Sequence, residues 1–133
     1  MPITSLSVIS VPVGDPDRAR DFYRDVLGFE LLAEQEFAPG QRWIQLAPRG
    51  AQTSITLTTW FEDFRPGALR GVILDVDDLD AEMARLRDAG LRFDGDVDDT
   101  PWGRFAAFRD PDGNRLSLHE PAWPARGAGE AGR

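Results

Sequence analysis

The sequence predicts an α+β fold built from two tandem βαβββ modules, with a curved mixed sheet around a groove and the helices on its outer face. Two observations carry this prediction. Strand, turn and helix signals follow the same order in residues 3–60 and in residues 71–121, and residues 42–46 correspond in sequence to 104–108. A repeat of this size indicates two copies of one structural unit. The apolar sheet faces must be buried under the helices, which leaves the opposite faces to form a shared concavity.

The first module begins with a β-rich run over residues 3–13. Asp15 is a suitable helix N-cap with Pro16 at the first helical position. The apolar residues that follow recur at i, i+3, i+4, i+7 and i+8, which predicts one amphipathic helix ending at Gly28. Three further strands are expected over residues 29–37, 42–47 and 54–60.

The second module repeats this order after a linker at residues 61–70, which contains Pro66 and Gly67. A strand at 71–76 precedes a helix that is capped by Asp77 or Asp78 and ends at Gly90. The remaining strands are predicted at 91–97, 104–109 and 115–120. The sequence DPDGN at 110–114 is a strong turn signal and joins the last two strands as a hairpin.

Length and composition bound the function. The 133 residues suffice for one domain, expected over residues 1–124, and the Gly-, Ala- and charge-rich segment 125–133 is predicted to be a disordered tail. The formal net charge of −8 disfavours nucleic acid and anionic membranes as partners. No apolar run approaches the roughly 20 residues that span a bilayer, and no signal peptide is visible, so a cytoplasmic location is expected.

Three residue types limit the possible chemistry. The chain has no Cys and no Lys, which excludes thiolate and Schiff-base catalysis. Its single His is His119, so no site with two or three histidines can be built within one chain.

Strand alternation predicts which side chains face the groove. On the third strand Ile44 and Leu46 would face the helix, leaving the neighbouring residues for the groove. Together with the matching positions of other strands and turns, the predicted ligand-binding residues are Trp43, Gln45, Thr56, Thr58, Trp60, Trp102, Arg104, Phe105, Ser117 and His119. They would form an aromatic-walled pocket with a few polar groups. Alternatively, Trp43 and Phe105 fill the core, and Trp60 and Trp102 belong to a dimer interface.

Three stretches resemble the vicinal oxygen chelate superfamily, which includes glyoxalase I, extradiol dioxygenases and bleomycin resistance proteins. They are VPVGDPDRARDFYRDVLGFEL, VDDLDAEMARLRDAG, and DPDGN followed by a strand that ends in Glu-Pro. The resemblance covers about residues 3–121 and implies the same repeated βαβββ fold. It also implies metal-ligand positions at Val8, Gly71 and Ser117 and near Thr56. None of these residues suits a divalent ion that prefers imidazole or carboxylate, so neither a metal nor another cofactor is expected.

The preferred functional hypothesis is therefore a homodimeric protein that binds a small, partly apolar molecule in the groove without a metal. One alternative is a glyoxalase-type lyase, isomerase or dioxygenase with a displaced metal site. Another is a metal-free enzyme that uses His119 and a carboxylate as acid and base.

Overall fold

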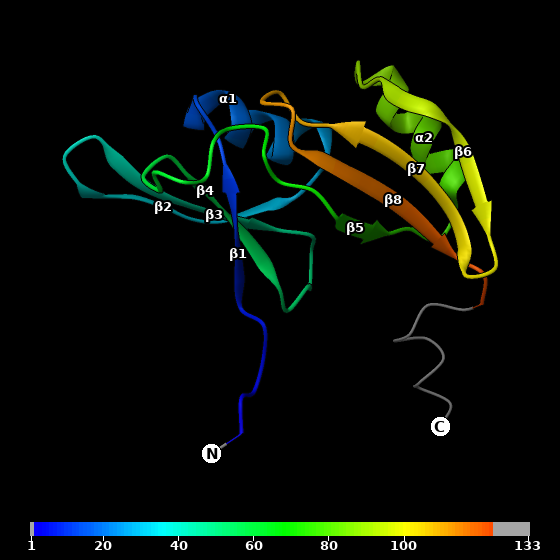
Figure 1. Ribbon diagram of the computed structural model, residues 1–133, viewed down its shortest axis with the longest axis horizontal. Coiled ribbons are helices and arrows are strands. Elements are labelled where there is room, and N and C mark those ends of the chain that lie inside the picture. Colours follow the sequence, from blue (N-terminus) through cyan, green and yellow to red (C-terminus); the bar gives the residue numbers. More distant parts are fainter. Residues whose placement is uncertain (1, 124–133) are drawn as a thin grey trace. The chain divides into compact units, whose positions relative to one another are not determined.

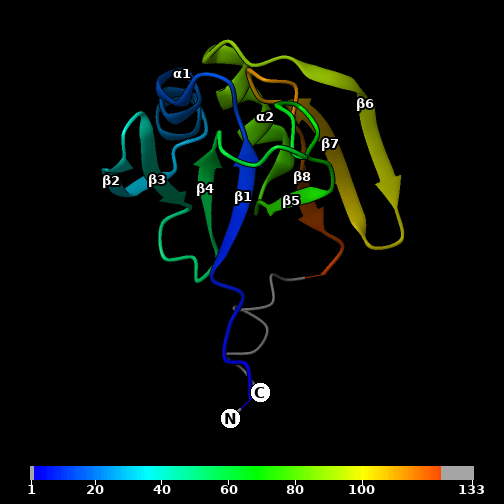
Figure 2. The same ribbon diagram turned by 60° about the vertical axis from the view of Figure 1, so that its left-hand side comes forward.

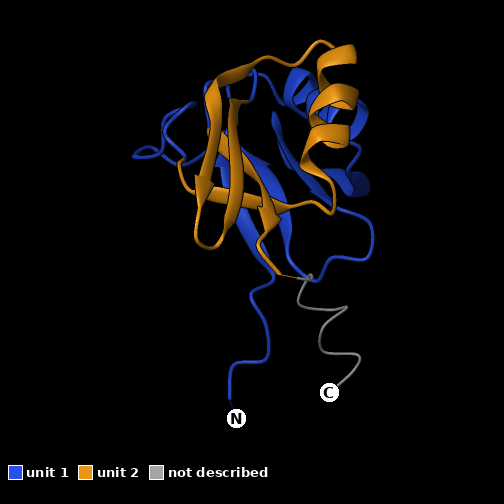
Figure 3. Cartoon of the chain, turned by 90° about the vertical axis from the view of Figure 1, so that its right-hand side faces the viewer, with its two compact units in different colours: residues 1–69, 110–114 blue, residues 70–109, 115–133 orange. Residues whose placement is uncertain are grey.

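The computed structural model describes residues 2–123. It divides into two compact units, which are coloured separately in Figure 3. Unit 1 comprises residues 1–69 and 110–114, and unit 2 comprises residues 70–109 and those from 115 onward. No helix in residues 2–123 is long and apolar enough to cross a membrane.

Unit 1 contains one four-stranded mixed sheet and one helical segment (Figure 1). The elements are β1 (Val8–Pro12), α1 (Pro16–Asp21), the π-helical turn η1 (Phe22–Val26), β2 (Glu30–Ala38), β3 (Gln41–Ala47) and β4 (Ser54–Thr58). The strand order is β1-β4-β3-β2. β1 runs parallel to β4 (Figure 2), whereas β2, β3 and β4 pair antiparallel.

The first strand is shorter than the predicted run over residues 3–13. Its pairing with β4 begins at Val8, which lies opposite Ser54. β4 starts at Ser54, so the residues before Val8 have no strand to pair with in this sheet. Ile3 and Leu6 are accordingly exposed despite their apolar side chains.

The predicted helix after Asp15 does form, but its second half is wound more loosely than an α-helix. The Asp15 carboxylate accepts hydrogen bonds from the backbone N–H groups of Asp17 and Arg18, as a helix N-cap does. From Phe22 the chain forms a π-helical turn, in which the Leu27 N–H donates to the Phe22 carbonyl at 3.1 Å. Periodicity alone could not predict this extra residue, because apolar spacing does not distinguish an α-turn from a single π-turn.

The turn at residues 110–114 is part of unit 1, although the sequence suggests that it belongs to the second module. Tyr23, fully buried on η1, donates its O–H to an Asp110 carboxylate oxygen at 2.7 Å. Burial raises the pKa of the Tyr23 phenol, and the adjacent Asp110 carboxylate raises it further, so the phenol stays protonated and remains a donor. Asn114 Nδ2 donates to the Pro12 carbonyl at 2.8 Å, and Asn114 Oδ1 accepts from the Leu69 N–H at 3.1 Å.

Unit 2 repeats the βαβββ order. Its elements are β5 (Val72–Asp75), α2 (Leu79–Asp88), β6 (Phe93–Thr100), β7 (Gly103–Arg109) and β8 (Arg115–Pro121). The strand order is β5-β8-β7-β6, with β5 parallel to β8 and the other pairs antiparallel. The two repeated modules confirm the predicted α+β fold.

Helix α2 covers one face of the unit 2 sheet (Figure 3). Of the two predicted caps, Asp77 and Asp78, it is Asp78 that caps the helix by accepting from the Ala81 N–H at 3.1 Å. Leu79, Met83 and Leu86 are buried on the face that packs on the sheet. The other face of each sheet carries no helix of its own unit, and we call it the open face.

Candidate functional site

On the open face of unit 1, a chain of hydrogen bonds holds the side chains of β3 and β4. Trp43 Nε1 donates to Gln45 Oε1 at 3.0 Å, and Gln45 Nε2 donates to Ser54 Oγ at 2.7 Å. The Ser54 hydroxyl in turn donates to the Ser7 carbonyl at 3.0 Å. The alternation predicted for β3 is confirmed, since Ile44 and Leu46 are fully buried while Trp43 and Gln45 are only partly so.

Two threonines lie on the same face of β4. Thr56 pairs with Gln45 of β3 and with Ser10 of β1, so its side chain projects between theirs. Thr56 and Thr58 are 1% and 2% exposed. The Thr58 hydroxyl lies 3.5 Å from the Val11 carbonyl, whereas the Thr56 hydroxyl has no hydrogen-bond partner among the described residues.

Trp60 belongs to an aromatic cluster that the sequence did not predict. The Phe37 ring meets the Trp60 ring edge-on at 5.0 Å between centroids, and Phe61 lies 6.0 Å from Trp60. Phe37 and Phe61 are half-exposed, so the cluster offers an apolar surface to solvent. Phe37 could not be anticipated from alternation, because irregular pairing between Glu36 and Ala38 interrupts the register of β2.

On the open face of unit 2, His119 uses both ring nitrogens. Nδ1 lies 2.8 Å from an Asp75 carboxylate oxygen, and Nε2 lies 3.1 Å from the Trp102 carbonyl. The Phe105 ring stacks on the imidazole at 4.4 Å between centroids. Both partners of the ring are acceptors, so only the doubly protonated imidazole donates to both at once. Both ring nitrogens of His119 are thus directed at protein oxygens, and these contacts hold the imidazole in place.

A cavity of about 430 Å³ opens beside Phe105 on this face. It contains two predicted site residues, Phe105 and Ser117, and six that the prediction omitted. Its lining residues are Asp94, Asp96, Asp98, Thr100, Phe105, Ala107, Arg115 and Ser117. With three carboxylates and one guanidinium, the lining is acidic at neutral pH.

The carboxylates of this cavity carry a signal that sequence analysis could have used. Asp94, Asp96 and Asp98 alternate along β6, and strand residues at every second position share a face. The structure pairs Asp94 with Ala107 and Asp98 with Phe105, with an irregularity between the two pairs. The alternation predicts that the three aspartates share one face of β6. Which residues of β7 they lie beside depends on the irregular pairing, which the sequence does not show.

Arg104 lies on the opposite face from the one expected. Its guanidinium contacts Asp80 of α2 at 3.1 Å, which places it on the helix-covered side. The reason is strand alternation, because the neighbouring Phe105 occupies the open face. Trp102 lies in the β6–β7 turn and is 62% exposed. Unit 2 thus brings together Phe105, Ser117 and His119, and Arg104 is absent from that group.

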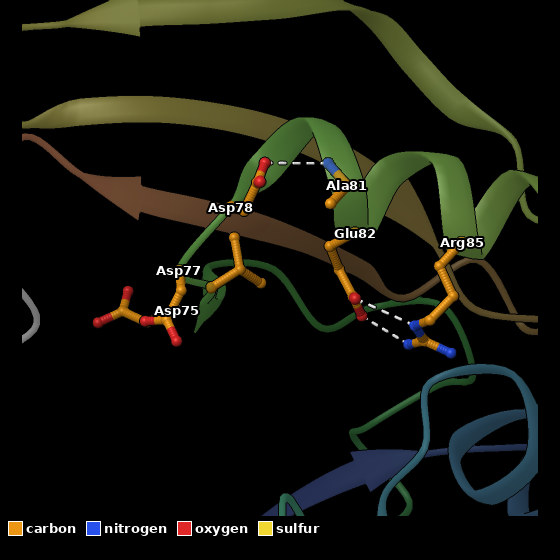
Figure 4. Close-up of a pocket in the computed structure, with 7 residues that line it drawn as sticks. Asp75, Asp77, Asp78, Ala81, Glu82 and Arg85 are labelled. Atoms are coloured by element: carbon orange, nitrogen blue, oxygen red, sulfur yellow. Dashed lines mark hydrogen bonds and ion pairs between the residues drawn. The ribbon is translucent and has the colours of Figure 1, made fainter.

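A second cavity, of about 510 Å³, lies at the start of α2 (Figure 4). Its polar groups are largely explained by helix capping and ion pairing. Asp78 accepts from the Ala81 N–H, and Glu82 pairs with Arg85 one turn along the helix. Asp75, which also lines the cavity, contacts His119. None of the predicted ligand-binding residues lines it, so we do not place the site here.

The positions at which the resemblance implies metal ligands do not fit a metal. Val8 and Gly71 offer no ligand atom, and Thr56 and Ser117 offer only neutral hydroxyls. Residues 2–123 also contain no group of three or more His, Asp or Glu side chains arranged to hold an ion. The donor set therefore lacks the imidazoles and carboxylates that zinc, iron, nickel and manganese prefer.

Residues 5–118 match the model of the Glyoxalase/Bleomycin resistance protein/Dioxygenase superfamily. The structure resembles that of TnmS3, an antibiotic binding protein from Streptomyces sp. CB03234, with 48% identity and a TM-score of 0.86 over 92% of this chain and 99% of that chain. A glyoxalase/bleomycin resistance protein from the same organism is 50% identical, with a TM-score of 0.77 over 86% and 99% of the two chains. A superfamily member from Sphaerobacter thermophilus DSM 20745 is 34% identical, with a TM-score of 0.81 over 89% and 98%.

Proposed function

The chain belongs to the Glyoxalase/Bleomycin resistance protein/Dioxygenase superfamily, and on that premise we propose that it binds a small, partly apolar molecule on the open face of its unit 2 sheet without a metal. The observation that carries this proposal is the cavity of about 430 Å³ lined by Phe105 and Ser117. Its size is typical of small-molecule sites, and it sets one aromatic ring, Phe105, among mostly polar and charged side chains. The similarity to an antibiotic binding protein at 48% identity supports binding as the activity.

The lining of the cavity favours particular ligands. The Phe105 ring offers an apolar surface for stacking, and its position is supported by the His119 imidazole behind it. Asp94 is paired with Arg109 at 3.1 Å and Arg115 also lines the cavity, so the three carboxylates exceed the neighbouring cations by one and the local potential favours positive groups. A ligand with an aromatic or apolar body and an ammonium group fits this combination best.

Two features argue against a reaction at this site. Val8, Gly71 and Ser117 do not form a set of metal ligands, so the site lacks the residues that would hold a metal ion to activate a substrate oxygen. His119 could serve as a general base only after losing its contact with Asp75 or with the Trp102 carbonyl. We therefore infer that the protein holds its ligand without converting it. The homodimer and the cytoplasmic location expected from the sequence stay predictions.

Replacing Phe105 by Ala tests the binding proposal, because Phe105 is the aromatic residue that lines the cavity. We expect the affinity for the best ligand from a screen of small aromatic compounds and antibiotics to fall by roughly 1–3 kcal/mol, because a partly buried aromatic contact is lost. Ser117→Ala should cost less, since a neutral hydroxyl contributes less than an aromatic ring. Calorimetric titration of the wild type and both variants gives these values.

Trp123→Ala is the matched control, because Trp123 is 64% exposed and does not line the cavity. It should bind the ligand as the wild type does. If Phe105→Ala also binds with unchanged affinity, the cavity beside Phe105 is not the ligand site and the proposal is wrong.

A further inference from the structure

Two arginines lie directly opposite each other on the open face of unit 2. Arg109 of β7 pairs in register with Arg115 of β8, and strand alternation places Arg109 on the same face as Phe105. Like charges at directly opposite positions of two strands are destabilising. Asp94 relieves one of these charges, since its carboxylate lies 3.1 Å from Arg109 Nε. Arg115 is exposed and makes no ion pair or side-chain hydrogen bond within residues 2–123, so its charge is left uncompensated there.

Arg115 is also one of the residues that line the cavity of about 430 Å³. Between Arg115 and Phe105 the cavity is lined by Ala107 and Ser117, which lie opposite each other on β7 and β8. Their short side chains leave space that larger residues would fill. Phe105 precedes Arg109 by four positions on β7, which is a rise of roughly 13 Å in an extended strand. A molecule in this cavity therefore reaches an aromatic ring at one end and a guanidinium at the other.

The acidic side of the cavity is formed by β6. Asp96 and Asp98 line the cavity, are exposed, and have no ion-pair partner in the described part of the chain. Strand β7 lies between β6 and β8, so these aspartates and Arg115 lie on strands two spacings apart, which is roughly 10 Å. Free charges of opposite sign thus occupy separate places around one cavity.

We propose that Arg115 binds an acidic oxygen group of the ligand, so that the preferred ligand is a zwitterion with an aromatic body. This inference rests on the proposed binding function and adds an anionic group to the ammonium group named there. The guanidinium presents a planar fork of N–H donors that matches the two oxygens of a carboxylate. A carboxylate at this place also offsets the repulsion between Arg115 and Arg109. Stacking on Phe105 and attraction to Asp96 and Asp98 hold the rest of the ligand.

The discriminating experiment compares 6-(aminomethyl)-2-naphthoic acid with its methyl ester. Both probes carry the same ring system and the same ammonium group, but only the acid is a zwitterion at neutral pH. The net charge of −8 attracts the cationic ester more strongly than the zwitterion, so a preference for the acid requires a local contact. Equilibrium dialysis measures the dissociation constant of each probe. The wild type should bind the acid about fivefold to tenfold more tightly, as one charge-assisted contact allows.

Arg115→Gln should abolish this preference, because it removes the charge and keeps a polar side chain. Arg87→Gln is the matched control, since it changes the net charge of the chain by the same amount. Arg87 lies on α2, with its guanidinium 5.4 Å from the centre of the Phe93 ring, and it does not line the cavity. Arg87→Gln should retain the wild-type preference for the acid.

A thermal unfolding measurement on the free proteins checks the same inference without a ligand. Arg115→Gln should melt at or above the wild-type temperature, because it removes a like charge opposite Arg109. This result also shows that the variant is folded under the conditions of the binding measurement.

The outcomes separate this inference from the proposed function. If the wild type binds the ester as tightly as the acid, or if Arg115→Gln still prefers the acid, binding stands and the role of Arg115 is refuted. An equal loss of preference in Arg87→Gln would show that net charge decides, and it would also refute the role. A clear fall in the melting temperature of Arg115→Gln would show that Arg115 has a structural partner, with the same consequence. If the wild type binds neither probe, the proposed function fails for aromatic amines, and the inference fails with it.

Discussion

Asn114→Ala is expected to lower the free energy of unfolding by about 2–6 kcal/mol, because it leaves two buried groups without the donor that Asn114 supplies, and each costs about 1–3 kcal/mol. Asn114 is fully buried and holds three groups together. Its Nδ2 donates to the Pro12 carbonyl and to Asp110, and its Oδ1 accepts from the Leu69 N–H. Alanine would leave the buried Pro12 carbonyl and the buried Asp110 carboxylate oxygen without this donor. Urea unfolding followed by circular dichroism measures the loss.

Gln52→Ala is the matched control for Asn114→Ala, since it also removes an amide side chain but from an exposed position. Its effect should stay within about 0.5 kcal/mol, as for most surface substitutions. If Asn114→Ala lowers the free energy of unfolding by less than about 1 kcal/mol, water must replace the amide, which would contradict the burial of Asn114.

The second large effect is expected for Gly103→Ala, in the first residue of β7. Gly103 has φ of 138°, which side chains rarely adopt, and an added Cβ would overlap the Glu120 carbonyl and lie 2.8 Å from His119 Nε2. The backbone strain costs about 1–3 kcal/mol, and displacing a strand carbonyl adds a comparable amount of about 1–3 kcal/mol. Adding these two contributions, we expect Gly103→Ala to lower stability by roughly 2–6 kcal/mol. We also expect it to weaken the contact between His119 and the β6–β7 turn.

Gly95→Ala separates backbone strain from overlap. Gly95 lies on β6 in the same unit and also has a positive φ, of 71°, but an added Cβ there meets nothing within 4 Å. Gly95→Ala should lower stability only by the strain of placing a side chain on a left-handed backbone, about 1–2 kcal/mol. If both variants lose equal stability, the close approach of Glu120 and His119 to Gly103 does not contribute.

Alternation and the internal repeat account for most of what could be predicted about the fold. Side-chain period fixes which face each residue of a regular strand takes, so the inward positions Ile44 and Leu46 and the outward position of Phe105 followed from the sequence. Arg104 was grouped with Phe105 although neighbouring residues of the predicted strand 104–109 must face opposite sides. In the structure Arg104 alternates with Phe105 on β7 and contacts Asp80 of α2.

The contacts that depend on distant segments could not be read from local patterns. The turn signal at 110–114 predicted a chain reversal, but nothing local indicates that Asp110 meets Tyr23, eighty-seven positions earlier. The same holds for His119, whose partners Asp75 and Trp102 lie on a different strand and in a turn. These contacts arise from strand order, which a single sequence constrains only through the repeat.

The central claim, that this chain binds a small molecule without a metal, is tested most directly by titrating the best ligand of the screen in the presence and absence of EDTA. The residues at Val8, Gly71 and Ser117 offer no strong ligand atoms, so the dissociation constant should be the same under both conditions. Binding that disappears in EDTA and returns when one equivalent of a divalent metal is added would contradict the account.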